Sequence, residues 1–140
     1  MIRVLLSYAT TDLDKVRKLR DDLRRAALEV WVAADDILIG ESIPRAVARL
    51  VKRADFVLPC LSKAAVASGW VKAELDLAVM QQFGKDTNRV VPVRFEPVDP
   101  PDVIAHLKYV DLFPDALSYQ DGVAKLVTSI KALKLGAESP

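Results

Sequence analysis

The chain has 140 residues, of which 51% are hydrophobic, and its 20 basic and 19 acidic side chains give a formal net charge of +1. This length predicts one domain with a substantial core, and the balanced charge does not indicate nucleic acid or an anionic membrane as a partner. The single cysteine, Cys60, excludes an internal disulfide framework, and without a signal-peptide pattern or an apolar run of ~20 residues the chain is predicted to be soluble and cytoplasmic.

Short apolar runs alternate with amphipathic segments, which predicts a parallel sheet flanked by helices. The five predicted strands are rich in Val, Leu and Ile, and they cover residues 2–6, 28–32, 55–61, 89–94 and 109–112. Pro59 lacks an amide hydrogen, so the third strand is expected to be irregular there or to pair on one side only at that residue. The predicted fold class is α/β, a flavodoxin-like doubly wound five-stranded parallel sheet in the order 2-1-3-4-5.

Three helices are predicted in the first half of the chain. The first follows Asp12, an acceptable N-cap, and carries apolar residues at helical spacing up to Leu23. Aspartates alternate with its basic residues, so its outer face is expected to be solvated and to carry local ion pairs. The second helix is expected after Ser42, with Pro44 in its first turn, and the third after Ser68.

The C-terminal part is expected to contain a helical turn at residues 103–107 and a long last helix at about residues 118–135. Five apolar residues of this helix are expected to face inward: Val123, Leu126, Val127, Ile130 and Leu133. Residues 136–140 show no periodicity. The domain is therefore predicted to cover residues 1–135, and residues 136–140 to form a tail or the start of a linker to a further domain.

Polar residues are expected to meet where the first and third strands end, because ligands bind beyond these carboxyl ends in a sheet of this order. Ser7 and Tyr8 follow the first strand, and the third strand leads through Ser62 into the helix that carries Trp70 and Glu74. A spacing of four places the last two on one helix face, where an aromatic ring desolvates a carboxylate and tunes it for chemistry. The structural alternative is an anchoring tryptophan followed by a solvated glutamate.

The segment of residues 33–41 is long and charged and contains Gly40, as expected of a lid or a docking loop. Its apolar residues 37–39 would form a docking surface if they were exposed. Asp35 and Asp36 are interpreted as loop solvation, or as favourable charge ahead of the second helix, rather than as ligand groups.

Several enzyme classes are excluded by the residues present. The chain has no P-loop, and no Gly-x-Gly-x-x-Gly follows the first strand. A response-regulator receiver would need an aspartate at the end of the third strand, where this chain has Pro59 to Ser62. His106 is the only histidine and is interpreted as a surface or packing residue, so histidine-based triads and most zinc sites are excluded and no metal is expected.

Three motifs, in this order, make the sequence resemble Toll/interleukin-1 receptor (TIR) domains, particularly the bacterial branch, over nearly the whole chain. They are the first box, the BB loop and the motif of the NAD-cleaving members, represented here by Leu5-Leu6-Ser7-Tyr8 with Asp12, by residues 35–41 from Asp35 to Glu41, and by Trp70-x-x-x-Glu74.

The resemblance implies that Glu74 is the catalytic carboxylate of an NAD glycohydrolase and stabilises the ribosyl cation left by nicotinamide. NAD would be the substrate, and no cofactor is implied. The resemblance also implies contacts to the dinucleotide from Ser7, Tyr8, Gly40 and Trp70. For Trp70 core packing is an equal alternative, and for Ser7 the alternative is that its hydroxyl satisfies loop backbone.

Two functions stay open at this point. The first is an enzyme activated by self-association through residues 35–41, in bacterial immune defence, with a C-terminal sensor domain in the full-length protein. The second is a non-catalytic scaffold that signals by homotypic TIR contacts. Glu74 favours the enzyme, because many pure adaptors of the family lack a carboxylate there. Leu38 and Ile39 stand where some catalytic members carry an acidic or small residue, which weakens the expectation of loop contacts to the ligand.

Overall fold

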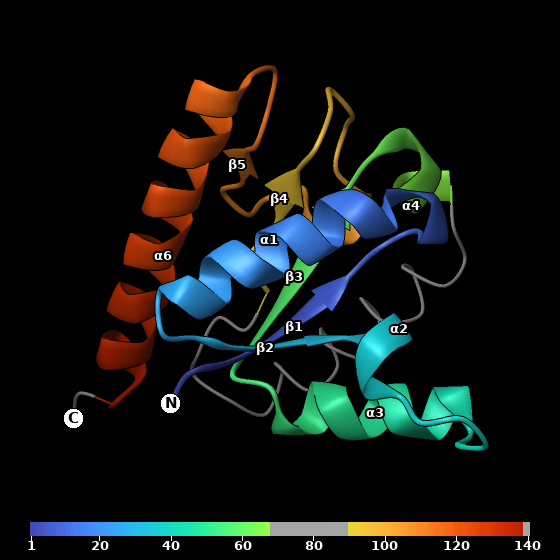
Figure 1. Ribbon diagram of the computed structural model, residues 1–140. Helices are drawn as coiled ribbons and strands as arrows, with labels where there is room; N and C mark the ends of the chain where they lie inside the picture. The colour runs from blue at the N-terminus through green and yellow to red at the C-terminus, as the bar shows by residue number, and fades with distance from the viewer. Residues whose placement is uncertain (68–89, 139–140) are drawn as a thin grey trace.

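Five parallel strands form one sheet in the order β2-β1-β3-β4-β5 in the computed structural model, which describes residues 1–67 and 90–138 (Figure 1). The strands are β1 (Arg3–Ser7), β2 (Glu29–Val32), β3 (Phe56–Leu61), β4 (Val93–Arg94) and β5 (Val110–Asp111). The predicted flavodoxin-like topology is thereby confirmed. Its carboxyl edge brings together the segments that follow β1, β2 and β3.

The central strand β3 contains Pro59, and its pairing differs on its two sides. Toward β1 the register is continuous, and Ser7 pairs with Pro59. Toward β4 the described residues pair at Cys60 and Leu61, after an isolated bridge at Val57. The interruption falls at the proline, which has no amide hydrogen to donate. The predicted one-sided pairing at Pro59 is confirmed.

Helices cover both faces of the sheet (Figure 1). One buried cluster packs α1 (Leu13–Arg25) and α6 (Ala116–Glu138) against Val4 and Leu6 of β1. A second cluster packs α3 (Ile43–Arg53) and α4 (Lys63–Ala67) against Leu5 and Val57. Alternate residues of β1 therefore belong to different cores, as the period of two in a strand requires.

Several helix boundaries differ from the predictions. The sequence did not indicate η1 (Thr10–Asp12), α2 (Ala33–Asp36) or α4, and η2 (Asp102–Ile104) is shorter than the expected turn. α6 continues to Glu138, past its predicted end, and Leu133 on it is exposed rather than inward-facing. The third predicted helix, from Ser68, lies outside the described residues.

Asp12 and Ser42 occupy the predicted N-cap positions of α1 and α3, yet neither side chain makes a capping hydrogen bond. Asp12 instead accepts a hydrogen bond from a side chain at the end of β3. In the described part of the chain, no helix is both long and apolar enough to cross a bilayer.

Candidate functional site

A cavity of about 490 Å³ lies between the loop after β1 and the loop after β2. Two predicted site residues, Tyr8 and Gly40, line it together. Its other walls are mostly apolar and come from the segments after β1 and β2 and from the first residues of α1 and α3: Thr10, Leu13, Ala33, Ala34, Ile37, Leu38, Ile39, Glu41 and Ile43. An apolar hollow with few polar groups, at the carboxyl edge of an open sheet, is a typical ligand site.

Tyr8 joins the two loops that form this cavity. Its side chain is only 8% exposed and packs in the core between the sheet and α1. The backbone amide of Ala34 donates a hydrogen bond to its phenolic oxygen at 2.9 Å. The ring thus supplies a rigid wall, while the hydroxyl fixes the first turn after β2.

The backbone conformation at position 40 favours glycine over any other residue. Its φ of +93° lies in the region that side-chain-bearing residues rarely adopt, although a Cβ there would meet no atom within 4 Å. The turn around it is closed by hydrogen bonds from the Glu41 amide to the Leu38 carbonyl at 3.1 Å and from the Leu38 amide to the Glu41 carboxylate at 2.9 Å.

Ser7 is fully buried at the end of β1 and does not line the cavity. It alternates with Leu6 and Tyr8 along the chain, so it faces the other side of the sheet, toward the core of α3 and α4. Its Oγ has no hydrogen-bond partner among the described residues. Among the described residues, therefore, the Ser7 hydroxyl does not make the hydrogen bond to loop backbone that the alternative required. A buried hydroxyl without a partner is unusual and marks a place for a ligand group or a water.

A buried polar pair, Asp12 and Ser62, links η1 to the end of β3 and was not identified from the sequence. The Ser62 hydroxyl donates to the Asp12 carboxylate at 2.5 Å and accepts from the Ala65 amide at 3.0 Å. Ser62 thereby caps α4 and ties it to η1. Fifty positions separate Asp12 from Ser62 in the sequence, so no local pattern connects them.

Asp35 is exposed and Asp36 partly exposed, as their interpretation as loop solvation predicts, but both also have specific partners. Arg17 donates to both oxygens of Asp35, at 2.8 and 3.1 Å, and Arg20 donates to the same carboxylate. The hydrogen bond from Arg17 is the main cause that lowers the pKa of Asp35. Asp36 accepts a hydrogen bond from the Val32 amide at 2.7 Å.

The apolar tip of the loop after β2 is exposed, as a docking surface requires. The side chain of Leu38 is 70% exposed and that of Ile39 is fully exposed. Ile37, by contrast, packs against the core of α3 and α4, so the tip consists of two residues rather than the predicted three.

Trp70 and Glu74 lie between residues 68 and 89, outside the described residues, and their roles stay predictions. His106 is exposed on the surface. Within residues 1–67 and 90–138, no group of three or more His, Cys, Asp or Glu side chains is placed to hold a metal ion.

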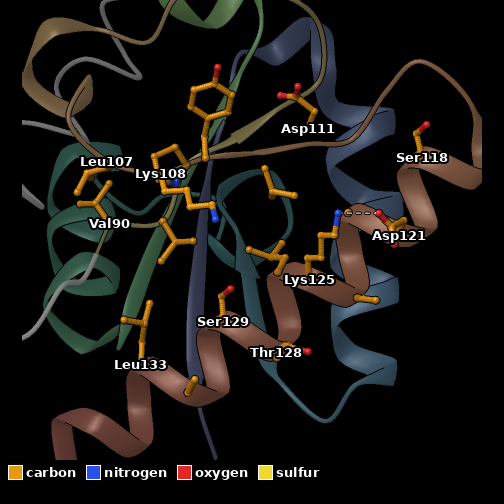
Figure 2. A pocket seen from close by; sticks show the side chains of 18 of the residues that line it. Val90, Leu107, Lys108, Asp111, Ser118, Asp121, Lys125, Thr128, Ser129 and Leu133 are labelled. Atoms are coloured by element: carbon orange, nitrogen blue, oxygen red, sulfur yellow. Dashed lines mark ion pairs between the residues drawn. The ribbon is translucent and has the colours of Figure 1, made fainter.

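A larger hollow of about 1320 Å³ lies at the outer strand β5, between α6 and the β4 and β5 segments. Figure 2 shows Val90 and Lys108 on one side of it and Lys125 and Ser129, from α6, on the other. We call it the β5 groove. Of the predicted site residues that the structure describes, Ser7, Tyr8 and Gly40, none lines it. The smaller cavity is the candidate site, because it lies at the carboxyl ends of β1 and β2 and is lined by two predicted site residues, Tyr8 and Gly40.

Comparison with known proteins gives a family match. A family model described as "TIR domain" matches residues 4–127. No match was found among curated proteins.

Solved structures of similar fold include the TIR domain of the Toll-related receptor TRR-2 from Hydra magnipapillata, with a TM-score of 0.76, 17% identity, and coverage of 91% of this chain and 97% of that chain. The TIR domains of the activated Roq1 resistosome have a TM-score of 0.74, 16% identity, and coverage of 93% and 99%. The CMP N-glycosidase BcmB of Clostridium botulinum has a TM-score of 0.63, 16% identity, and coverage of 91% and 98%. At these identities the likeness concerns the fold alone.

Proposed function

This chain belongs to the TIR domain family, and from that premise we propose that it is an NAD glycohydrolase, with Glu74 as its catalytic carboxylate. The observation that carries the proposal is the cavity at the carboxyl edge of the sheet, where Tyr8 and Gly40 meet. A protein of similar fold is named a CMP N-glycosidase, and release of nicotinamide from NAD breaks the same class of bond.

The reaction requires stabilisation of positive charge. Nicotinamide departs with the electrons of the bond to ribose, which leaves an oxocarbenium-like sugar that water attacks at C1′, giving ADP-ribose and a proton. An ionised carboxylate held in a site with little water stabilises this charge more than bulk water would. Capture of the cation by an atom of the same nucleotide would instead give a cyclic product.

The remaining predicted contacts have distinct roles in this proposal. The Tyr8 ring offers an apolar face to a planar base, and Trp70 is proposed to offer a second aromatic ring to the dinucleotide. Gly40 lets the loop backbone approach the ligand closely, because it carries no side chain. Ser7 does not line the cavity, so its predicted contact to the dinucleotide would need a bridging water at its unpartnered hydroxyl.

The direct test is nicotinamide release from NAD by concentrated protein, followed by chromatography of both products. Glu74→Gln should lower the turnover by about 10²-fold to 10³-fold. Glu29→Gln is the matched control, because Glu29 is a half-exposed carboxylate at the opposite end of β2. Unchanged turnover in Glu74→Gln would exclude Glu74 from the mechanism, and no nicotinamide from the assembled wild-type protein would exclude the enzyme.

Self-association forms part of the proposal. Exposure of the apolar tip, Leu38 and Ile39, to water is unfavourable in an isolated domain. The β5 groove, which lies at the other outer strand of the sheet, offers a mostly apolar surface that could receive this tip. A contact between two unlike surfaces propagates into a filament unless it closes into a ring. Activity should therefore rise more than linearly with protein concentration.

A mixing experiment tests this arrangement. Ile39→Asp should disable the tip, and Ala132→Arg should disable the groove, so each variant alone should stay monomeric. A mixture of the two retains one intact tip and one intact groove, and it should form dimers but no longer assemblies. Assembly by either variant alone at wild-type concentrations would exclude the tip-and-groove contact.

The second candidate function is a scaffold that signals through TIR contacts without chemistry. The exposed tip favours it, because docking needs no catalytic carboxylate. Assembly that proceeds normally in Glu74→Gln while nicotinamide release stops would support the enzyme, whereas assembly with no release in either protein would support the scaffold. A role in bacterial immune defence and a C-terminal sensor domain belong to the proposal of the self-associating enzyme.

A further inference from the structure

Two arginines of α1 bind a single carboxylate in the loop after β2. Arg17 makes a bidentate contact with Asp35, and Arg20 donates to the same group. The two arginines are three positions apart, so they share one helix face. The Arg20 side chain is only 15% exposed, whereas those of Arg17 and Asp35 are 42% and 31% exposed, so the Arg20 side of this contact is the one that is shielded from water.

The segment that carries Asp35 cannot hold its own shape. α2 has four residues, and a helix of that length is unstable by itself because it cannot repay the loss of conformational freedom. Its position therefore depends on its partners. Those partners are Arg17 and Arg20 at Asp35, Tyr8 at the Ala34 amide, and the Val32 amide at Asp36.

The other end of the loop is braced separately. Arg49 of α3 donates to Glu41 at 2.9 Å, and the same carboxylate accepts from the Leu38 amide. The tip between these two anchors makes the exposed apolar surface, and the inner side of the loop forms the wall of the cavity. Displacement of α2 would thus change the cavity and the tip together.

We infer that Asp35 is a positioning residue: held by Arg17 and Arg20, it fixes α2 so that the loop after β2 closes the cavity against Tyr8. The functional part of this inference rests on the proposed NAD glycohydrolase activity. The structural part does not, because the position of the loop can be measured without substrate.

The structural test is hydrogen exchange of the segment 33–41 in Asp35→Asn, which keeps the shape of the side chain and removes its charge. Loss of a bidentate charged contact should increase exchange in this segment by about tenfold, with β1 and β3 unchanged. Glu29→Gln, which breaks the exposed pair with Arg3 at the start of β2, is the control and should leave the segment unchanged. Wild-type exchange in Asp35→Asn would overturn the inference.

The functional test uses the same variants with NAD. Asp35→Asn should raise KM by about tenfold and change kcat little, because a misplaced wall weakens binding of substrate and transition state alike. Arg17→Gln should raise KM less, because Arg20 still donates to Asp35, and the double variant should be no worse than Asp35→Asn alone, because Arg17 acts only through Asp35 in this proposal. Additive increases in KM in the double variant, or a fall in kcat with KM unchanged, would contradict a shared positioning role. If wild-type protein releases no nicotinamide, the proposed function fails while the exchange result still decides the role of Asp35.

Discussion

The amide of Ala34 donates a hydrogen bond to the phenolic oxygen of Tyr8 at 2.9 Å, so the end of β1 and the first turn after β2 are joined by one side chain. The same ring is a wall of the candidate cavity. A residue that links two loops and lines a cavity transmits a change in either loop to the site between them.

Tyr8→Phe keeps the ring and removes this link. The Ala34 amide would lose its partner, and we expect the free energy of unfolding to fall by about 1 kcal/mol. KM for NAD should rise, because the loop after β2 loses one of its anchors. Urea unfolding and steady-state kinetics measure the two effects. Tyr109→Phe is the control, since Tyr109 is exposed and packs its ring against Arg94, and it should leave KM unchanged.

Ser7→Ala tests whether the buried hydroxyl is kept for a ligand. Removal of a hydroxyl without a partner relieves a desolvation penalty, so we expect the variant to be as stable as the wild type or more stable by up to about 1 kcal/mol. Because Ser7 does not line the candidate cavity, the affinity for NAD should stay at the wild-type value, and a fall in affinity would show that a ligand group reaches the hydroxyl. Isothermal calorimetry and urea unfolding give both quantities.

Ser62→Ala is the matched comparison, because Ser62 is equally buried but fully bonded. It leaves the Asp12 carboxylate and the Ala65 amide without a partner and should lower the free energy of unfolding by about 1–3 kcal/mol. An equal fall in the free energy of unfolding of Ser7→Ala would show that the Ser7 hydroxyl has a hydrogen-bond partner in solution.

Two glycines of α6 should respond to alanine with opposite signs. A Cβ at Gly122 would lie 2.6 Å from the Asp111 carbonyl oxygen and 2.7 Å from Cδ2 of Leu112, so α6 would have to move away from β5. We expect Gly122→Ala to lower the free energy of unfolding by about 1–3 kcal/mol, despite the better helix propensity of alanine. At Gly136 nothing lies within 4 Å, and alanine should raise stability by about 0.5–1 kcal/mol. Thermal unfolding of both variants checks the signs, and equal signs would contradict the close approach at Gly122.

Asp55 should make stability depend on pH in the acid range. Its carboxylate accepts hydrogen bonds from the Arg3 amide at 2.8 Å and from Lys134 Nζ at 2.9 Å. Burial by itself raises the pKa of Asp55, but these hydrogen bonds outweigh it and hold the pKa below its ordinary value. The folded state therefore binds fewer protons than the unfolded state, and the stabilisation is complete above about pH 4 and is lost as the pH falls through the lower folded pKa.

Asp55→Asn should lower the free energy of unfolding by about 1–2 kcal/mol at pH 7, because a hydrogen bond to a charged group is replaced by a neutral one. Its difference from the wild type should narrow as the pH falls below about 4. Urea unfolding at several pH values between 7 and 3 measures the difference. A difference that is constant over this range would mean that the charge of Asp55 does not contribute.

The sequence by itself determined which segments form the sheet and the order of the strands. Apolar runs such as residues 2–6 predict strands buried on both faces, and their alternation with amphipathic helices predicts the strand order. Pro59 likewise indicates its own one-sided pairing, because the missing amide hydrogen is a property of the residue. These features depend on local composition and period, which the sequence states directly.

Only the tertiary structure decided which side chains meet. Arg17 was expected to form a local ion pair within its own helix, yet it binds Asp35 of α2. Asp12 was expected to cap α1, yet its carboxylate accepts a hydrogen bond from Ser62 instead. Ser7 and Tyr8 are adjacent in the chain but face opposite cores, so only Tyr8 reaches the cavity. Such contacts depend on the distances between packed elements, and a one-dimensional pattern does not contain those distances.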